Sequence, residues 1–145
     1  MRKLIIKQFF TEVSDAEIAE FEAMNDIVFP EFFKAFIKDY NGSKVYENCF
    51  QGKYIISNFL PLKKNRNASI ELIMPAIKSE EEGIGRDDLI PFAIDPGGRP
   101  YLFSVGKNDF GQVYIDRMSA GYQDPLLKIA DSFEQFIQGL EREPS

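Results

Sequence analysis

The order of two kinds of apolar spacing is the feature that most limits how this chain can fold. Segments 14–24, 30–42 and 132–140 carry apolar residues three and four positions apart, which is the spacing of an amphipathic helix. Between them, residues 45–62 and 89–117 contain short runs of β-branched and aromatic residues separated by glycine, which indicate strands. Helices at both ends and strands in the middle predict an α+β fold. We expect a largely antiparallel sheet of about four to six strands, flanked by N-terminal and C-terminal helices.

The first predicted helix has a recognisable start. Ser14 and Glu17 have the spacing of a capping box, in which each side chain accepts a hydrogen bond from the other residue's backbone amide. Ile18, Phe21 and Met24 follow on one face and are predicted to point into the core.

Two further predicted helices carry aromatic stripes. Pro30 suits the first turn of one, and Asn41-Gly42 supplies residues that tolerate positive φ at its exit. Ser132 and Gln135 give the other helix a capping-box spacing. The stripes, which we expect to form core, are Phe33, Phe36, Ile37 and Tyr40 in the first helix and Phe133, Phe136, Ile137 and Leu140 in the second.

Residues 89–117 predict an antiparallel meander of three strands. The first two strands are joined by "DPGGRP", which is either a phosphate-binding loop or a hairpin turn. The segment has neither of the glycine spacings typical of phosphate loops and no helix start after it, so we interpret it as a turn. In that turn Asp95 can bond forward to the backbone, and Gly97 and Gly98 permit positive φ.

The segment before this meander, residues 63–88, has a weaker pattern. Ser69 and Leu72 could begin a helix, which Pro75 would kink or end. The polar stretch 79–88 is predicted to be a loop.

The chain has no histidine and a single cysteine, which removes most familiar catalytic and metal-binding arrangements. We interpret Cys49 as a small buried apolar residue, because a reactive thiolate usually needs a neighbouring base or cation. Carboxylate chemistry stays open, although most acidic residues lie on predicted helix faces or in loops, where a solvated surface is the default. We therefore expect no metal and no cofactor.

The length of 145 residues predicts a single domain over residues 1–145, and 44% hydrophobic with 28% charged residues is typical of a soluble globular protein. The longest apolar runs fall far short of the roughly 18 residues that a membrane helix needs, and no signal-peptide cleavage site follows the N-terminal apolar patch. We expect a cytoplasmic protein with no membrane contact.

Four segments, taken in order, carry a family resemblance. They are "FPEFFKAFIKDYNG" (29–42), "LIPFAIDPGGRPYLFSV" (89–105), "GQVYIDR" (111–117) and "IADSFEQFIQGL" (129–140). Their arrangement is similar to the SMI1/KNR4 family, also called the SUKH superfamily, with a proline-started helix ending in Asn-Gly, an "iPFA-D-gG" hairpin and a terminal helix. The chain departs from the pattern at Arg99-Pro100, where Asn or Asp is more usual. The resemblance covers a core of about 14–140.

The resemblance implies a domain without catalytic activity. In bacteria such domains chiefly serve as immunity proteins, which bind and neutralise a cognate toxin of a polymorphic or contact-dependent system. Eukaryotic relatives are associated with cell-wall synthesis and signalling, so the alternative is a regulatory or scaffolding SMI1/KNR4-type module with a non-toxin protein partner. From the residues alone, a carboxylate-dependent enzyme also stays open.

The charge pattern indicates the kind of partner. The net charge is −6, and five acids crowd the predicted loop beside only Lys78 and Arg86. Such a patch argues against direct nucleic-acid binding and for a basic protein partner, such as a nuclease toxin, while the alternative is a solvated loop that aids solubility. The candidate partner-binding residues are these acids, Glu80, Glu81, Glu82, Asp87 and Asp88, with Phe110 and Tyr122 as aromatic anchors.

Overall fold

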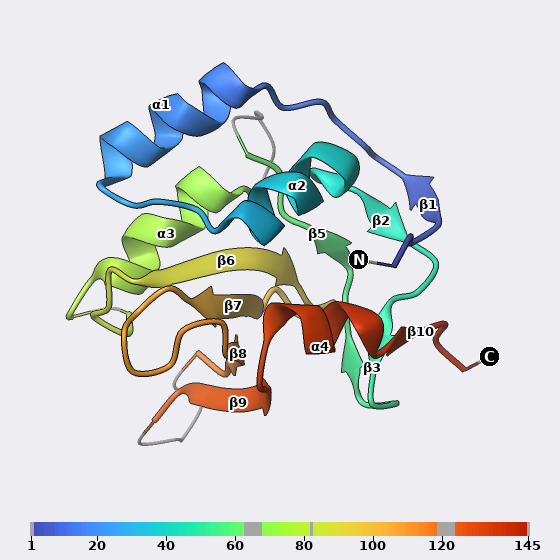
Figure 1. Ribbon diagram of the computed structural model, residues 1–145. Helices are drawn as coiled ribbons and strands as arrows, with labels where there is room; N and C mark the ends of the chain where they lie inside the picture. Colours follow the sequence, from blue (N-terminus) through green and yellow to red (C-terminus); the bar gives the residue numbers. More distant parts are fainter. Residues whose placement is uncertain (1, 63–67, 82, 119–123, 145) are drawn as a thin grey trace.

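The computed structural model describes residues 2–62, 68–81, 83–118 and 124–144. Its helices are α1 (Asp15–Asn25), α2 (Glu31–Tyr40), α3 (Ile70–Lys78) and α4 (Phe133–Gln138). Its strands are β1 (Ile6–Gln8), β2 (Lys44–Val45), β3 (Cys49–Phe50), β4 (Tyr54–Ile55), β5 (Asn58–Phe59), β6 (Leu89–Ile94), β7 (Pro100–Ser104), β8 (Val113–Asp116), β9 (Leu126–Ala130) and β10 (Leu140–Glu141). The predicted α+β class with a largely antiparallel sheet is confirmed (Figure 1).

The main sheet has five strands in the order β5-β6-β7-β8-β9, and every neighbouring pair is antiparallel. The predicted meander corresponds to β6, β7 and β8, with Ile90 opposite Phe103 and Leu102 opposite Tyr114. Strands β1, β9 and β10 were not predicted. β9 extends the meander as an edge strand, whereas β1 and β10 belong to small separate sheets.

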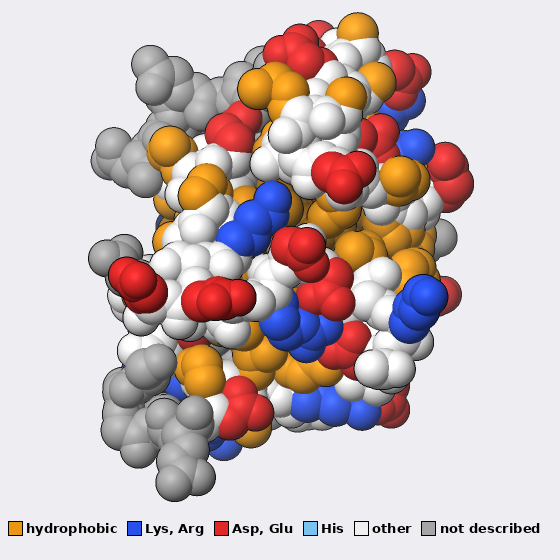
Figure 2. All heavy atoms as spheres, turned by 90° about the vertical axis from the view of Figure 1, so that its left-hand side faces the viewer, with side chains coloured by type: hydrophobic (Ala, Val, Ile, Leu, Met, Phe, Trp, Pro, Cys, Tyr) orange, Lys and Arg blue, Asp and Glu red, His pale blue; other side chains and the backbone are white. Residues whose placement is uncertain are grey.

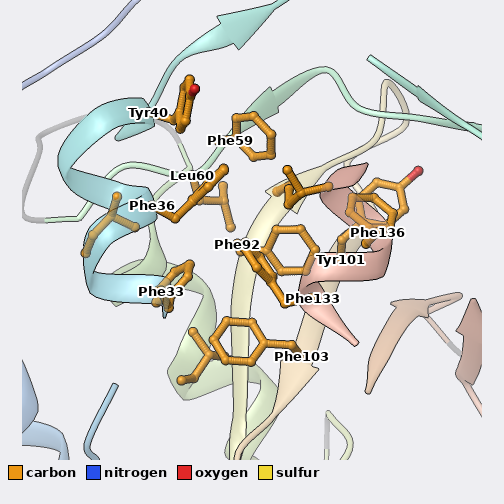
Figure 3. Packing of buried hydrophobic residues seen from close by; sticks show 14 of the residues in the cluster. Phe33, Phe36, Tyr40, Phe59, Leu60, Phe92, Tyr101, Phe103, Phe133 and Phe136 are labelled. Carbon is orange, nitrogen blue, oxygen red and sulfur yellow. The ribbon is translucent and has the colours of Figure 1, made fainter. Parts of the chain in front are cut away.

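Helices cover both faces of the main sheet. On one face, the ring of Phe103 in β7 lies 4.8 Å from Phe33 of α2 and 5.4 Å from Phe133 of α4. On the other face, Leu102 of β7 packs with Ile77 of α3. Successive strand residues point to opposite faces, so β7 separates the aromatic core from the smaller cluster under α3. Figure 3 shows the rings of α2 and α4 meeting over the sheet.

Both predicted aromatic stripes are buried, with one change in α4. Leu140 begins β10 and does not end the helix. Ser132 Oγ accepts a hydrogen bond from Gln135 N at 2.9 Å, whereas the Gln135 side chain accepts from Asp131 N. Only one of the two capping-box bonds is therefore made at this helix start.

α1 starts at the predicted capping box, and Ser14 and Glu17 make both reciprocal bonds. Ile18 and Phe21 are buried as predicted, but Met24 is 75% exposed, so its assignment to the buried face was wrong. Helical residues advance by about 100° each, which places Met24 about 120° around the axis from Ile18. Its side chain therefore turns away from the core.

The "DPGGRP" segment forms the predicted hairpin turn between β6 and β7. Asp95 Oδ1 accepts hydrogen bonds from Gly97 N at 2.9 Å and from Arg99 N at 2.7 Å. Of the two glycines, only Gly98 takes a positive φ, 88°. The carboxylate fills the role of backbone acceptor inside the turn, which is the usual reason for Asp at this position.

The segment with the weaker sequence pattern, residues 63–88, contains α3. Ser69 caps this helix, with its Oγ accepting a hydrogen bond from Leu72 N at 3.3 Å. The helix continues past Pro75 to Lys78, so the proline does not end it. Within the described parts of the chain, no helix has both the length and the hydropathy needed to cross a membrane.

Candidate partner-binding surface

The connection between α3 and β6, residues 79–88, folds back on the C-terminal end of α3. The carbonyl oxygen of Ile77 accepts hydrogen bonds from Ile84 N at 3.1 Å and from Gly85 N at 2.9 Å. A Cβ atom at Gly83 would overlap the carbonyl oxygen of Ala76. These contacts satisfy carbonyls that a helix end leaves unpaired and fix the path of the predicted loop.

This path decides where the candidate residues lie. Glu80 and Glu81 are exposed directly after α3, and Asp87 is exposed before β6; we call these three residues the loop acids. Phe110, in the connection between β7 and β8, is 58% exposed. Glu82 and Tyr122 lie outside the described residues. The last candidate, Asp88, pairs with Arg86.

Arg86 clamps the loop to the connection between β7 and β8. Its Nε donates to Asp88 Oδ1 at 2.8 Å, and its Nη1 and Nη2 each donate to one carboxylate oxygen of Asp109 at 3.1 Å. Asp109 also accepts hydrogen bonds from Ser104 Oγ at 2.5 Å and from the Tyr114 hydroxyl at 2.6 Å. Asp88 is therefore an ion-pair partner, and the acidic patch with uncompensated charge is smaller than the sequence indicated.

The clamp holds its charges at neutral pH. Burial alone would raise the pKa of Asp109, but hydrogen bonds from Arg86, Ser104 and Tyr114 lower it to about 2. Burial, together with the hydrogen bond to Asp109, raises the pKa of Tyr114 to about 12. The hydrogen bond to Asp88 raises the pKa of Arg86. A carboxylate and a phenol shifted in these directions exchange no protons near pH 7, so this cluster acts as a structural tie.

Three candidate residues, Asp87, Asp88 and Phe110, line one open hollow of about 490 Å³. The connection between α1 and α2 forms the opposite wall, where Val28 is 74% exposed. Figure 2 shows this side of the molecule, where charged side chains stand around patches of apolar surface. The complete lining is Asp26, Ile27, Val28, Phe29, Pro30, Asp87, Asp88, Val105 and Phe110.

The lining contains three carboxylates, of which Asp88 is paired with Arg86 from outside the lining, while Asp26 and Asp87 are exposed. Its exposed apolar groups come from separate loops. Such a surface suits a side chain with an apolar stem and a positive end. Sequence reasoning missed Asp26 and Val28. The signal that could have found them is "DIVFP", in which Val28 stands between the buried residues Ile27 and Phe29 while the chain turns from one helix to the next.

Comparison with known proteins places the chain in a family. No curated protein matches the chain closely enough to count as a relative. The model of the SMI1 / KNR4 family (SUKH-1) matches residues 12–139, which run from just before α1 to the end of α4. This span includes the aromatic helix stripes, the hairpin turn, the clamp and the hollow. The chain belongs to the SMI1/KNR4 family (SUKH-1).

Proposed function

We propose that this protein is a non-catalytic immunity protein that binds and neutralises a cognate toxin of a polymorphic or contact-dependent system. The observation that carries the proposal is the family match over residues 12–139, because SUKH proteins are commonly immunity proteins. The mechanism is occupancy of a toxin surface, which requires a preformed interface and no chemistry of its own.

The state of the reactive groups supports a non-catalytic role. Cys49 is buried, and burial, followed by the nearby charge of Glu143, raises the pKa of its thiol, so the nucleophilic thiolate is disfavoured. Asp109 accepts hydrogen bonds at both carboxylate oxygens, from Arg86 and from two hydroxyl groups. A carboxylate held in this way is a poor general base.

We assign toxin binding to the hollow between the α1–α2 connection and the wall formed by Asp87, Asp88 and Phe110. Its carboxylates favour a basic partner such as a nuclease, since opposite charge speeds encounter. Phe110 and Val28 supply exposed apolar area, and aromatic side chains most often anchor interfaces. The Arg86 clamp holds one wall rigid, so little conformational entropy is lost on binding.

The test first looks for a toxin gene beside the gene of this protein, and then co-expresses the protein with that toxin. Host cells are expected to survive expression of the toxin only when this protein is present. Phe110→Ala should weaken binding of the purified toxin by about tenfold or more, as expected for an interface anchor. Leu72→Ala is the matched control, because Leu72 is equally exposed at 58% but lies on α3 outside the hollow.

The outcomes separate the two parts of the proposal. Absence of protection would overturn the immunity role and favour the regulatory or scaffolding alternative. Protection that Phe110→Ala leaves intact, at unchanged affinity, would keep the immunity role and remove this hollow from the interface.

A further inference from the structure

The N-terminal arm, residues 2–11, is a second surface with the opposite charge. It precedes the family match, which begins at residue 12. Its strand β1 pairs with β2 in a sheet of its own. Figure 1 places β1 on the opposite side of the molecule from the loop between α3 and β6.

The arm is anchored firmly. Arg2 Nη1 donates a hydrogen bond to the carbonyl oxygen of Leu140 at 2.6 Å, and Leu4 N donates to the Tyr40 hydroxyl at 2.8 Å. The Leu4 side chain is buried in the main core. The arm is therefore a preformed part of the surface, and a ligand that binds it does not need to order it first.

One edge of β1 is open. Tyr46 N donates to the carbonyl oxygen of Ile5 at 2.9 Å, so that carbonyl faces β2. Alternation along a strand turns the amide and carbonyl of Ile6 to the other side, where no second strand lies among the described residues. Such an edge pairs readily with an added strand.

The outer face of the arm combines apolar and cationic groups. Ile5 is 52% exposed, and Tyr46 of the neighbouring chain segment is 41% exposed. Lys7 Nζ lies 5.6 Å from the centroid of the Tyr46 ring, and Arg142 Cζ lies 5.0 Å from it. The two cations flank one exposed ring on the β2 side of β1, and of the two only Lys7 belongs to β1 itself.

The charge of the arm is one-sided. Residues 2–11 contain Arg2, Lys3 and Lys7 and no carboxylate, although the whole chain has a net charge of −6. The buried carboxylate beside the arm, Glu47, accepts a hydrogen bond from Ile5 N at 3.0 Å and lies 4.0 Å from Arg2 Nη2. The negative charge of Glu47 is therefore compensated by Arg2 and the Ile5 amide inside the structure. The outer face of the arm stays positive.

We propose that β1 is a docking edge for an extended, acidic segment of a partner protein. The segment adds as a strand beside Ile6, and its carboxylates meet Lys3 and Lys7, the exposed cations of the arm. A second copy of this chain fits the edge poorly, because two arms would bring like charges together. A lipid surface would leave the backbone groups of the edge without partners. The proposal does not depend on the immunity role, because it concerns a separate face.

The probe is a capped peptide of about eight alternating Glu and Val residues, a typical strand length. It is titrated into the intact, isotope-labelled protein and followed by NMR. Amide shifts are expected to gather at residues 5–8 and at Tyr46. The same peptide N-methylated at alternate amides should not bind, since it cannot pair along the edge.

Protein variants test the same contacts. Lys7→Glu should weaken peptide binding by about tenfold, because it replaces an attraction by a repulsion. Lys53→Glu is the matched control and should leave binding unchanged, since Lys53 Nζ lies at a comparable 5.4 Å from the ring of Tyr54 elsewhere on the surface. Ile6→Pro removes the outward amide without changing charge and should abolish binding.

Several results would overturn the proposal. One is absence of binding at millimolar peptide, and another is equal binding by the N-methylated peptide or by the Lys7→Glu variant. Shifts at residues 5–8 caused by phosphatidylserine vesicles and not by the peptide would identify a membrane surface instead. A dimer that Lys7→Glu dissolves would identify a second copy as the occupant.

Discussion

Replacing Phe136 by alanine tests how the fold is held together. The side chain is fully buried, and its ring centroid lies 4.7 Å from Phe50, 5.5 Å from Phe92 and 5.7 Å from Tyr101 (Figure 3). These neighbours belong to three different strands, β3, β6 and β7, so no single movement of the backbone can close the space that the ring leaves.

The cost of this change has two parts. Loss of the transfer free energy of the benzyl group accounts for about 2 kcal/mol. The cavity that stays open adds a similar amount, because the surrounding rings are held by their own strands. We therefore expect Phe136→Ala to lower the free energy of unfolding by about 3–5 kcal/mol. Phe36→Ala on α2 removes a ring from the same core and should cost a similar amount.

Equilibrium unfolding in urea measures these differences. With a slope of about 2 kcal/mol per molar urea, the midpoint of Phe136→Ala should fall by about 2 M relative to the unchanged protein. Glu81→Ala is the surface control and should change the free energy of unfolding by less than about 0.5 kcal/mol. Equal midpoints for Phe136→Ala, Phe36→Ala and Glu81→Ala would refute the assignment of the core.

Three further outcomes are expected. Reversal of the loop acids to lysine should slow association with a basic toxin and flatten its salt dependence, measured by stopped flow; unchanged rates in the folded variant would exclude the loop from steering. Burial alone would raise the pKa of Asp109, but hydrogen bonds lower this pKa to about 2. Its stabilising contribution is therefore full above the unfolded value of 3.8 and is lost as pH falls toward about 2. The difference in urea midpoint between the protein and Asp109→Asn should shrink over that window, and a constant difference would contradict the shift. Gly83→Ala should cost about 1–3 kcal/mol in the same assay, because its Cβ would overlap a helix carbonyl, whereas Gly97→Ala has room and should cost clearly less.

Sequence periodicity predicted the parts of the fold that depend on local pattern. The stripe of Phe33 and Phe36 specifies both a helix and its buried face, because an amphipathic helix has one way to bury such a stripe. The Asp95 turn was equally accessible, since its hydrogen bonds join residues within four positions of each other. Both features are short-range and need no knowledge of the rest of the chain.

Elements that depend on distant partners were missed. β9, with the sequence "LLKIA", lacks clear alternation, and its strand character comes from pairing with β8. β1 and β10 are two or three residues long and exist because β2 and β3 lie beside them. Propensity over so few residues is too weak to indicate a strand, so tertiary contacts decide.

The candidate hollow shows the same division. Asp87 and Phe110 were singled out for their chemistry, and the structure places both on one surface. The opposite wall, with Asp26 and Val28, is about sixty positions away from Asp87 in the chain and could not be assigned to it from spacing. The Arg86 clamp could not be predicted from the sequence either. Asp88 is close to Arg86 in the chain, but Asp109 completes the clamp from another loop.

The two proposed surfaces allow the effect of local charge on association to be separated from the effect of net charge. Asp87→Lys adds two positive units to the acidic hollow, and Lys7→Glu removes two from the basic arm, so a variant with both changes keeps the net charge of −6. The Debye length at physiological ionic strength is about 8 Å, so each binding partner responds chiefly to the charges near its own site. We therefore expect the double variant to associate more slowly than the unchanged protein both with a basic toxin and with the acidic peptide. Association rates measured for each partner at equal ionic strength decide the question. If both rates equal those of the unchanged protein, net charge governs encounter, and neither the hollow nor the arm steers a partner.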